Sequence, residues 1–333
     1  GSSKALYKKE IKESLKRGEI DLLIGTHALI YDNVEFKNLG LAIIDEQHKF
    51  GVAQRSKLWH KNKLPPHILI MTATPIPRTL AMSVYGDLDM SVIDELPPGR
   101  KYINTIHQTH NQRLKLIDFL KNEIKKGRQA YVVYPLIKES EKLDFKDLMD
   151  GYETFSRDFP MPKYQISIVH GKMNNEDKEY EMRRFIENKT QILVSTTVIE
   201  VGVDIPNATV MIIESAERFG LSQLHQLRGR VGRGQHKSYC FLITGNKKTK
   251  ESKIRMETMV NTNDGFIIAE KDLELRGPGN IMGTQQSGEM PLRVTNLISD
   301  TKLILKVRKL VEKILTINIV ISILNVKSLL KDE

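Results

Sequence analysis

Short apolar runs of strand length alternate with helical segments along most of this chain. Near the amino terminus, Tyr7, Ile11 and Leu15 recur at helical spacing. The elements expected there are a helix ending at Gly18 and strands at 21–25, 41–44 and 68–71. Such alternation predicts an α/β fold with parallel sheets that carry helices on both faces.

A second alternation starts after Pro97, Pro98 and Gly99, which cannot continue a helix or a central strand. The elements expected beyond them are helices at 116–127 and 176–187 and strands at 130–134, 166–169, 191–195, 209–213 and 238–243. Residues 138–162 show weak periodicity, so an inserted loop is expected there. Beyond residue 250 helices flank a Gly-rich stretch, and the predicted domains are therefore 1–98, 99–250 and 251–333.

Positive charge is concentrated in one part of the chain. The net charge is +10 and the sequence pI is about 9.4. No acidic residue occurs between positions 219 and 250, and the basic residues there are Arg228, Arg230, Arg233, Lys237, Lys247, Lys248 and Lys250. A polyanion is the natural partner of such a segment.

Cysteine content and hydropathy restrict the class of protein and its cellular location. The one cysteine, Cys240, excludes an intramolecular disulfide framework and zinc knuckles, and its apolar neighbours predict a buried strand thiol. The longest apolar stretch, 314–324, is too short and too interrupted to span a bilayer, and no signal peptide opens the sequence. A cytoplasmic protein without a membrane partner is expected.

Two carboxylates follow the apolar run 41–44. Asp45 and Glu46 lie where a buried strand would deliver them to a phosphate site. An Asp at the carboxyl end of a parallel strand can hold Mg²⁺ through water, and the adjacent Glu can orient or deprotonate the water that attacks a γ-phosphate. A solvated strand end that caps the next turn is the alternative explanation.

Two arginines lie three residues apart beside glycines in a distant segment. Gly229 and Gly232 would let the backbone approach a ligand closely, and Arg230 and Arg233 could reach a transferring phosphoryl group. A guanidinium that stabilises charge on the γ-phosphate raises the rate by about 10³ or more in related NTPases. A basic loop on a solvated face is the alternative explanation.

Four long motifs occur in an order that resembles a known family. They are 45–52 (DEQHKFGV), 71–79 (MTATPIPRT), 195–204 (STTVIEVGVD) and 226–233 (QLRGRVGR). Together they resemble motifs II, III, V and VI of the superfamily 2 helicases, in the form carried by the RecG family of branch-migration helicases. The nearest alternative is the transcription-repair coupling factor, which has Asp-Glu-Glu-Gln where this chain has Asp45-Glu46-Gln47-His48.

The resemblance implies RecA-like motor domains, the first partial and the second complete, and a role for each matching residue. Asp45 would hold Mg²⁺, and Glu46 would be the catalytic base. Gln47 and His48 would couple to the second domain. The other implied nucleotide-facing residues are Gly202, Asp204, Gln226, Arg230 and Arg233, of which both arginines would be catalytic and Arg233 would be the arginine finger. ATP and Mg²⁺ are thus the implied cofactors.

A further set of residues is implied to contact DNA or to relay hydrolysis to it: Thr26, His27, Thr72, Thr74, Thr196 and Thr197. In the family, Thr72 and Thr74 belong to the motif between the nucleotide and DNA sites, and capping of a strand-to-helix turn is their alternative role. Thr196 and Thr197 would meet DNA phosphates at a strand end. A structural role for His27 is an equal alternative.

A helical hairpin followed by a loop is the translocation motif of this family. It is matched by Ile254-Arg255 and by residues 272–286. The resemblance assigns Arg255, Arg276 and Gln286 to the link between motif VI and the loop that pushes on duplex DNA; side chains that only fix a surface loop are the alternative. The implied partners are branched or forked DNA and, as a further candidate, single-strand DNA-binding protein, with the protein itself a monomer.

One pattern of the family is missing from these 333 residues. They contain no G-x-x-x-x-G-K-[ST] phosphate loop, since the single Gly-Lys pair, Gly171-Lys172, precedes Met173. The chain is therefore predicted to be a fragment of an ATP-dependent DNA helicase and double-strand DNA translocase, without the wedge domain and inactive alone. A noncatalytic nucleic-acid-binding fragment is the main alternative, and a metal-dependent nuclease or phosphatase would need further carboxylates or histidines around the metal.

Overall fold

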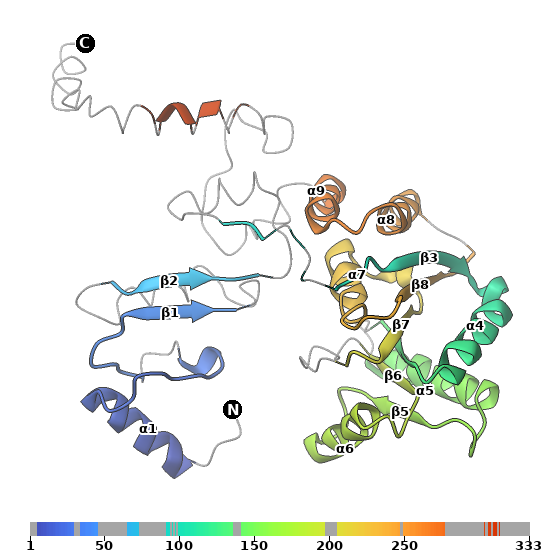
Figure 1. The fold of residues 1–333 in the computed structure, drawn as a ribbon, viewed down its shortest axis with the longest axis horizontal. Coiled ribbons are helices and arrows are strands. Elements are labelled where there is room, and N and C mark those ends of the chain that lie inside the picture. Colours follow the sequence, from blue (N-terminus) through green and yellow to red (C-terminus); the bar gives the residue numbers. More distant parts are fainter. Residues whose placement is uncertain are drawn as a thin grey trace. The chain divides into compact units, whose positions relative to one another are not determined.

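The computed structural model describes residues 5–29, 34–45, 65–72, 91–93, 95, 97, 99–135, 141–196, 205–246 and 249–276, together with 303, 306, 307, 309–311 and 313. The described residues form two compact units, one within 5–72 and one from residue 91 onward (Figure 1). None of the helices described in either unit combines the length and the apolar character that a bilayer-spanning helix needs.

The first unit begins with helix α1, Ala5–Arg17, where the helical spacing predicted it. Leu15 of this helix is buried. Gly18 ends the helix with φ +77°, and its N–H donates to the carbonyl of Leu15 (3.1 Å). This left-handed conformation favours glycine, so the predicted end of the helix is confirmed.

Strands β1, Leu41–Ile44, and β2, His67–Ile70, pair in parallel in the first unit. The second begins one residue earlier than expected. Ile44 is buried, but Leu41, Ile43 and Leu69 are 55%, 57% and 49% exposed. Both strands therefore exist as predicted, although much of their apolar surface is uncovered by the described residues.

The strand expected at 21–25 is not formed. Residues 21–26 take part in no strand pairing, and Leu22 and Ile24 are 77% and 86% exposed. A strand needs neighbouring backbone to pair with, and in the described part of this unit the strand ladder joins β1 to β2. The apolar residues at 22 and 24 are thus not sufficient for a strand without a partner.

The second unit contains a six-stranded parallel sheet in the order β3-β8-β7-β4-β6-β5 (Figure 1). Its strands are β3 Asn104–Thr109, β4 Gln129–Tyr134, β5 Ile166–Val169, β6 Ile192–Thr196, β7 Ala208–Ile213 and β8 Tyr239–Thr244. Five of them lie within one residue of the expected positions. The sixth, β3, was not predicted because its polar residues lack an apolar run, and as an edge strand it needs burial on fewer sides.

Helices cover both faces of this sheet, as the sequence predicted. On one face, α4, Arg113–Lys125, and α5, Glu141–Asp158, place Leu120 and Leu148 in an apolar cluster with Val132. On the other face, α6, Asn175–Ile186, places Phe185 in a cluster with Tyr131. The helices α7 Leu221–Arg228, α8 Lys250–Asn261 and α9 Gly265–Arg276 contribute to that second cluster. The doubly wound α/β architecture is confirmed.

Helix α5 corrects the prediction of an inserted loop at 138–162. Leu148, Phe155 and Phe159 are buried, and Tyr152 packs partly against the same cluster. Their spacing of four, three and four residues places them on one face of a helix and its end. The helix was missed because charged residues on its outward face obscure this stripe.

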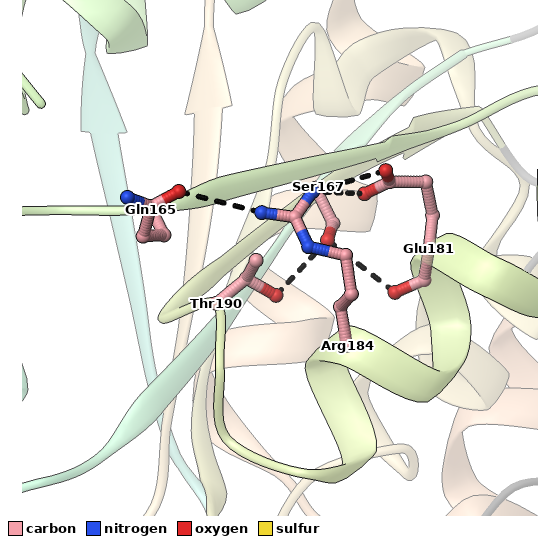
Figure 2. Close-up of polar contacts among 5 residues, drawn as sticks. All are labelled: Gln165, Ser167, Glu181, Arg184 and Thr190. Carbon is pink, nitrogen blue, oxygen red and sulfur yellow. Dashed lines mark hydrogen bonds and ion pairs between the residues drawn. The ribbon is translucent and has the colours of Figure 1, made fainter.

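Helix α6 and the edge strand β5 are joined by a polar network (Figure 2). The Arg184 guanidinium donates to both carboxylate oxygens of Glu181 (3.0 and 3.2 Å) and to Oε1 of Gln165 (3.3 Å). Ser167 Oγ donates to the Glu181 carbonyl (3.3 Å) and contacts Thr190 Oγ1 (3.0 Å). These contacts fix the helix to this edge of the sheet.

Helices α8 and α9 form the hairpin expected after residue 250, and they share the core of the sheet. Met256 and Met259 of α8 and Ile268 of α9 belong to the same apolar cluster as the strands. Cys240 of β8 is fully buried in this cluster, as predicted, and burial raises the pKa of its thiol to about 12. The domain boundaries near residues 98 and 250 stay predictions.

Candidate functional site

The motif at 226–233 spans the end of α7 and the turn that follows it. Leu221, Leu224 and Leu227 are buried and hold the helix against the sheet. The N–H of Gly229 donates to His225 O (2.9 Å), and the N–H of Arg230 donates to Leu227 O (3.0 Å). The turn is therefore a direct continuation of the helix, with its backbone position set by the helix.

Two glycines bring this turn close to a neighbouring side chain and to neighbouring backbone. Gly232 has φ +79°, and a Cβ there would lie 2.9 Å from Cγ1 of Ile103. A Cβ at Gly234 would lie 2.6 Å from the carbonyl oxygen of Pro206. Larger residues would push the turn away from the segment before β3 and from the segment before β7.

The predicted nucleotide-facing residues of this motif lie together on α7 and its turn. Gln226 and Arg230 are half-buried, and Arg233 is exposed. Two guanidinium groups approach one carbonyl, because Arg233 Nε and Arg100 Nη2 donate to Gly229 O at 3.3 and 3.4 Å. These bonds are long, so they orient the side chains only weakly. Arg230 and Arg233 thus lie on one turn that α7 holds in place, where their guanidinium groups can bind an anion.

Arg228 corrects the picture of a continuous polyanion-binding stretch. Its side chain is only 2% exposed, and its hydrogen bonds go to residues of the same unit rather than to solvent. Burial lowers the pKa of this guanidinium, which nevertheless remains a cation. Composition alone placed it with the exposed arginines, since sequence cannot separate a buried guanidinium from a solvated one. The residue was missed as a structural element of the site.

Arg255 joins the hairpin to the segment that leads into α7. Its Nη1 donates to Phe219 O (2.6 Å) and its Nη2 to Glu217 O (2.9 Å). A second polar contact runs from Ser222 Oγ of α7 to Asp272 Oδ2 of α9 (3.0 Å). Arg255 therefore lies where a link between motif VI and the hairpin requires it, although its role stays a prediction.

In the first unit, Asp45 and Thr72 follow the carboxyl ends of β1 and β2. Asp45 comes directly after Ile44, whose carbonyl accepts a hydrogen bond from the N–H of Met71 (2.8 Å). Because β1 and β2 are parallel, the two predicted site residues lie at one edge of the pair. Thr26 precedes the short 3-10 helix His27–Leu29 and is exposed.

Thr196 ends strand β6 at the carboxyl edge of the larger sheet. It is 2% exposed, and among the described residues its hydroxyl has no hydrogen-bond partner. The following residues, 197–204, are not among those described. The DNA-contacting role of Thr196 therefore stays a prediction.

Several predicted site residues lie outside the described part of the chain: Glu46, Gln47, His48, Thr74, Thr197, Gly202, Asp204 and Gln286. The side chains of His27 and Arg276 are likewise not described. Within the ranges that the structure describes, no group of three or more His, Cys, Asp and Glu residues is placed to hold a metal ion.

Three family models match this chain. The DEAD/DEAH box helicase model matches residues 2–83. The helicase conserved C-terminal domain matches residues 111–235, which contain strands β4, β5, β6 and β7 of the larger sheet and the motif VI turn. The model of domain 3, C-terminal, of the ATP-dependent DNA helicase RecG matches residues 262–323.

Individual relatives match over nearly the whole chain. The ATP-dependent DNA helicase RecG of Synechocystis sp. is 51% identical over 94% of this chain and 37% of its own length. The RecG protein of Bacillus subtilis is 54% identical over 90% of this chain and 43% of its own length. A solved structure of RecG bound to a three-way DNA junction is 44% identical, with a TM-score of 0.67 over 91% of this chain and 38% of that one.

The parallel sheet covered by helices and the helicase-domain matches define a superfamily 2 helicase with RecA-like domains. Within that class, the chain belongs to the RecG family of ATP-dependent DNA helicases. It spans less than half the length of these curated relatives.

Proposed function

We propose that this chain contributes the second motor domain, part of the first and the translocation hairpin to an ATP-dependent DNA helicase that remodels stalled forks and branched DNA. The observation that carries the proposal is the motif VI turn. It presents Gln226, Arg230 and Arg233 from one anchored helix, and the same helix is hydrogen-bonded to the hairpin. The turn that we propose to bind phosphate is thereby connected, through the hydrogen bonds of α7, to a second structural element, the α8–α9 hairpin.

The residues present fit ATP and Mg²⁺ by the chemistry of their donor groups. Arg230 and Arg233 are cations on a turn with close glycine packing, and Asp45 is a carboxylate at the end of a parallel strand. When bound, ATP supplies the phosphoanhydride whose hydrolysis releases free energy. We assign Mg²⁺ binding to Asp45, water activation to Glu46 and stabilisation of γ-phosphate charge to Arg233.

The proposed polymer partner is branched or forked DNA. Support comes from the net charge of +10, from the RecG relatives and from the solved RecG structure with a three-way DNA junction. We assign phosphate contacts to Thr26, His27, Thr196 and Thr197, and a relay role to Thr72 and Thr74. We further propose that the protein is a cytoplasmic monomer and that it binds single-strand DNA-binding protein.

The proposal is tested by two substitutions in the complete protein. Arg233→Ala should lower ATP turnover by about 10³, because the charge on the γ-phosphate loses its guanidinium, while DNA affinity changes little. Glu46→Gln should likewise lower turnover by orders of magnitude. Steady-state ATPase assays and DNA-binding titrations measure both quantities.

The matched control is Arg157→Ala, which removes an exposed arginine whose hydrogen bond to Thr154 lies within α5. It should leave turnover and DNA affinity unchanged. If Arg233→Ala instead weakened DNA binding strongly and left turnover intact, the motif VI arginines would belong to a DNA-backbone groove rather than to the nucleotide site.

A further inference from the structure

Arg228, the last residue of α7, directs its guanidinium at two other structural elements, β3 and the carboxyl end of α8. Nη1 donates to the carbonyls of Met259 and Thr262, each at 2.8 Å, and to Thr105 Oγ1 of β3 at 3.2 Å. Nη2 lies 3.2 Å from Nδ1 of His225. The side chain thus bridges the end of α7, the edge strand β3 and the carboxyl end of α8.

The two carbonyl contacts give Arg228 a particular hold on α8. The last carbonyls of a helix lack partners within the helix and carry partial negative charge. Met259 lies in the last turn of α8, and Thr262 directly follows the helix. A cation that donates to both carbonyls therefore fixes the end of this helix in position and direction.

Burying a guanidinium costs more free energy than burying an apolar side chain in the same place. Removing a cation from water is unfavourable unless hydrogen bonds replace its hydration. None of these four acceptors of Arg228 is a carboxylate, so the compensation comes from carbonyl, hydroxyl and imidazole groups. A leucine could fill an apolar gap here, whereas only a multidentate donor can tie three elements together.

The other end of α7 is tied to the same hairpin. Arg255 donates to the carbonyls of Glu217 and Phe219, just before α7, and Ser222 donates to Asp272 of α9. The helix that carries the motif VI turn is therefore bonded to α8 and α9 near both of its ends. Arg228 lies at the end from which the turn with Arg230 and Arg233 continues.

We propose that Arg228 is a positioning residue that transmits movement of the motif VI turn to the α8–α9 hairpin. The inference rests on the proposed helicase function and deepens it. Arg228 itself touches no nucleotide, because its guanidinium is buried and directed toward α8. Without it, ATP hydrolysis continues, but the hairpin no longer follows the turn.

The test compares two arginine-to-methionine variants in the complete protein. Arg228→Met keeps an unbranched side chain and removes every donor. It should retain DNA-stimulated ATP hydrolysis, while the number of base pairs unwound per ATP falls by about tenfold, the effect expected of a coupling residue. Arg228→Lys keeps the charge and some donors, and should recover part of the unwinding.

Arg184→Met is the matched control. Arg184 makes a comparable network with Glu181 and Gln165, beside β5 at the opposite edge of the sheet from β3 (Figure 2). Its loss should lower the melting temperature without changing the base pairs unwound per ATP. Thermal unfolding of each variant is measured beside both activities.

Three outcomes would overturn the proposal. Parallel loss of stability, hydrolysis and unwinding in Arg228→Met would show a purely structural residue. Loss of hydrolysis with unchanged unwinding per ATP would place Arg228 in the nucleotide site. Should Arg228→Met fail to fold, an unchanged coupling ratio in Arg228→Lys would reject the role. Failure of the proposed function itself is distinct, because the unsubstituted protein would then show no DNA-stimulated hydrolysis or unwinding.

Discussion

At the scale of single residues, the environment around α7 determines the chemistry of its side chains. His225 lies beside the buried guanidinium of Arg228. Burial lowers the pKa of His225 to about 4, with the positive charges of Arg228 and Arg100 acting in the same direction and Asp264 in the opposite one. The imidazole is therefore neutral near pH 7, and its Nδ1 can accept the hydrogen bond from Arg228.

This neutral imidazole predicts a specific pH dependence of stability. In the unfolded chain the pKa of histidine is about 6.5, so below that pH the unfolded state binds more protons than the folded state. The contribution of His225 is complete above about pH 6.5 and is lost as the pH falls toward 4. At pH 5 the loss should be about 2 kcal/mol.

His225→Asn keeps an acceptor and removes the titrating group. The free energy of unfolding of the wild-type protein should therefore fall more steeply than that of the variant between about pH 7 and pH 5. Urea denaturation at each pH measures the difference. A constant difference between the two proteins across this range would show that His225 is not held in its neutral form.

At the scale of secondary structure, α5 shows how a core element connects to its neighbours. Phe155 of this helix is buried, and the guanidinium of Arg113 lies 5.0 Å from the centre of its ring. Arg113 in turn donates to Glu214, a buried carboxylate that follows β7 (2.9 Å). The aromatic ring thus packs on the sheet and also covers an ion pair between α4 and the end of β7.

Truncation of this ring should be strongly destabilising. Phe155→Ala removes a fully buried side chain, so we expect a loss of about 3–5 kcal/mol in the free energy of unfolding. Glu153→Ala, an exposed substitution in the same helix, should change it by less than about 0.5 kcal/mol. The buried thiol of Cys240, the one cysteine of the chain, reports unfolding through its reaction with a thiol reagent. Small effects for both variants would mean that α5 is not part of the core.

At the scale of the whole chain, the two units differ in how completely they bury apolar residues. The second unit has a six-stranded sheet with apolar clusters containing residues of both faces. The described part of the first unit has a two-stranded sheet with half-exposed Leu41 and Ile43. A two-stranded sheet is marginally stable by itself, and among the described residues the larger buried core lies in the second unit.

At the same scale, a missing sequence pattern predicts the activity of the chain by itself. These 333 residues contain no phosphate-loop pattern, and without one we do not expect the proposed arginines and carboxylates to hold a γ-phosphate in line. The purified chain should therefore show little DNA-stimulated ATP hydrolysis while still binding DNA, as measured by phosphate release and by fluorescence anisotropy on the same sample. Robust hydrolysis that Glu46→Gln abolishes would contradict this expectation.

Local sequence determined most elements of the fold and the identity of the site motifs. Apolar runs and helical spacing are local properties, so five strands of the larger sheet and the helices α4 and α6 were predictable. The order of the four motifs likewise indicated the helicase class before any contact was known. These features depend on residue type and short-range periodicity, which a single chain displays directly.

Only the tertiary structure decided the features that depend on distant contacts. Strand β3 exists because β8 pairs with it, and residues 21–25 form no strand because the described residues offer them no partner. Arg228 differs from Arg230 because it meets Thr105, a residue 123 positions away, together with the end of α8. Burial and hydrogen-bond partners depend on packing between elements. Residue type alone therefore does not determine which arginine is buried.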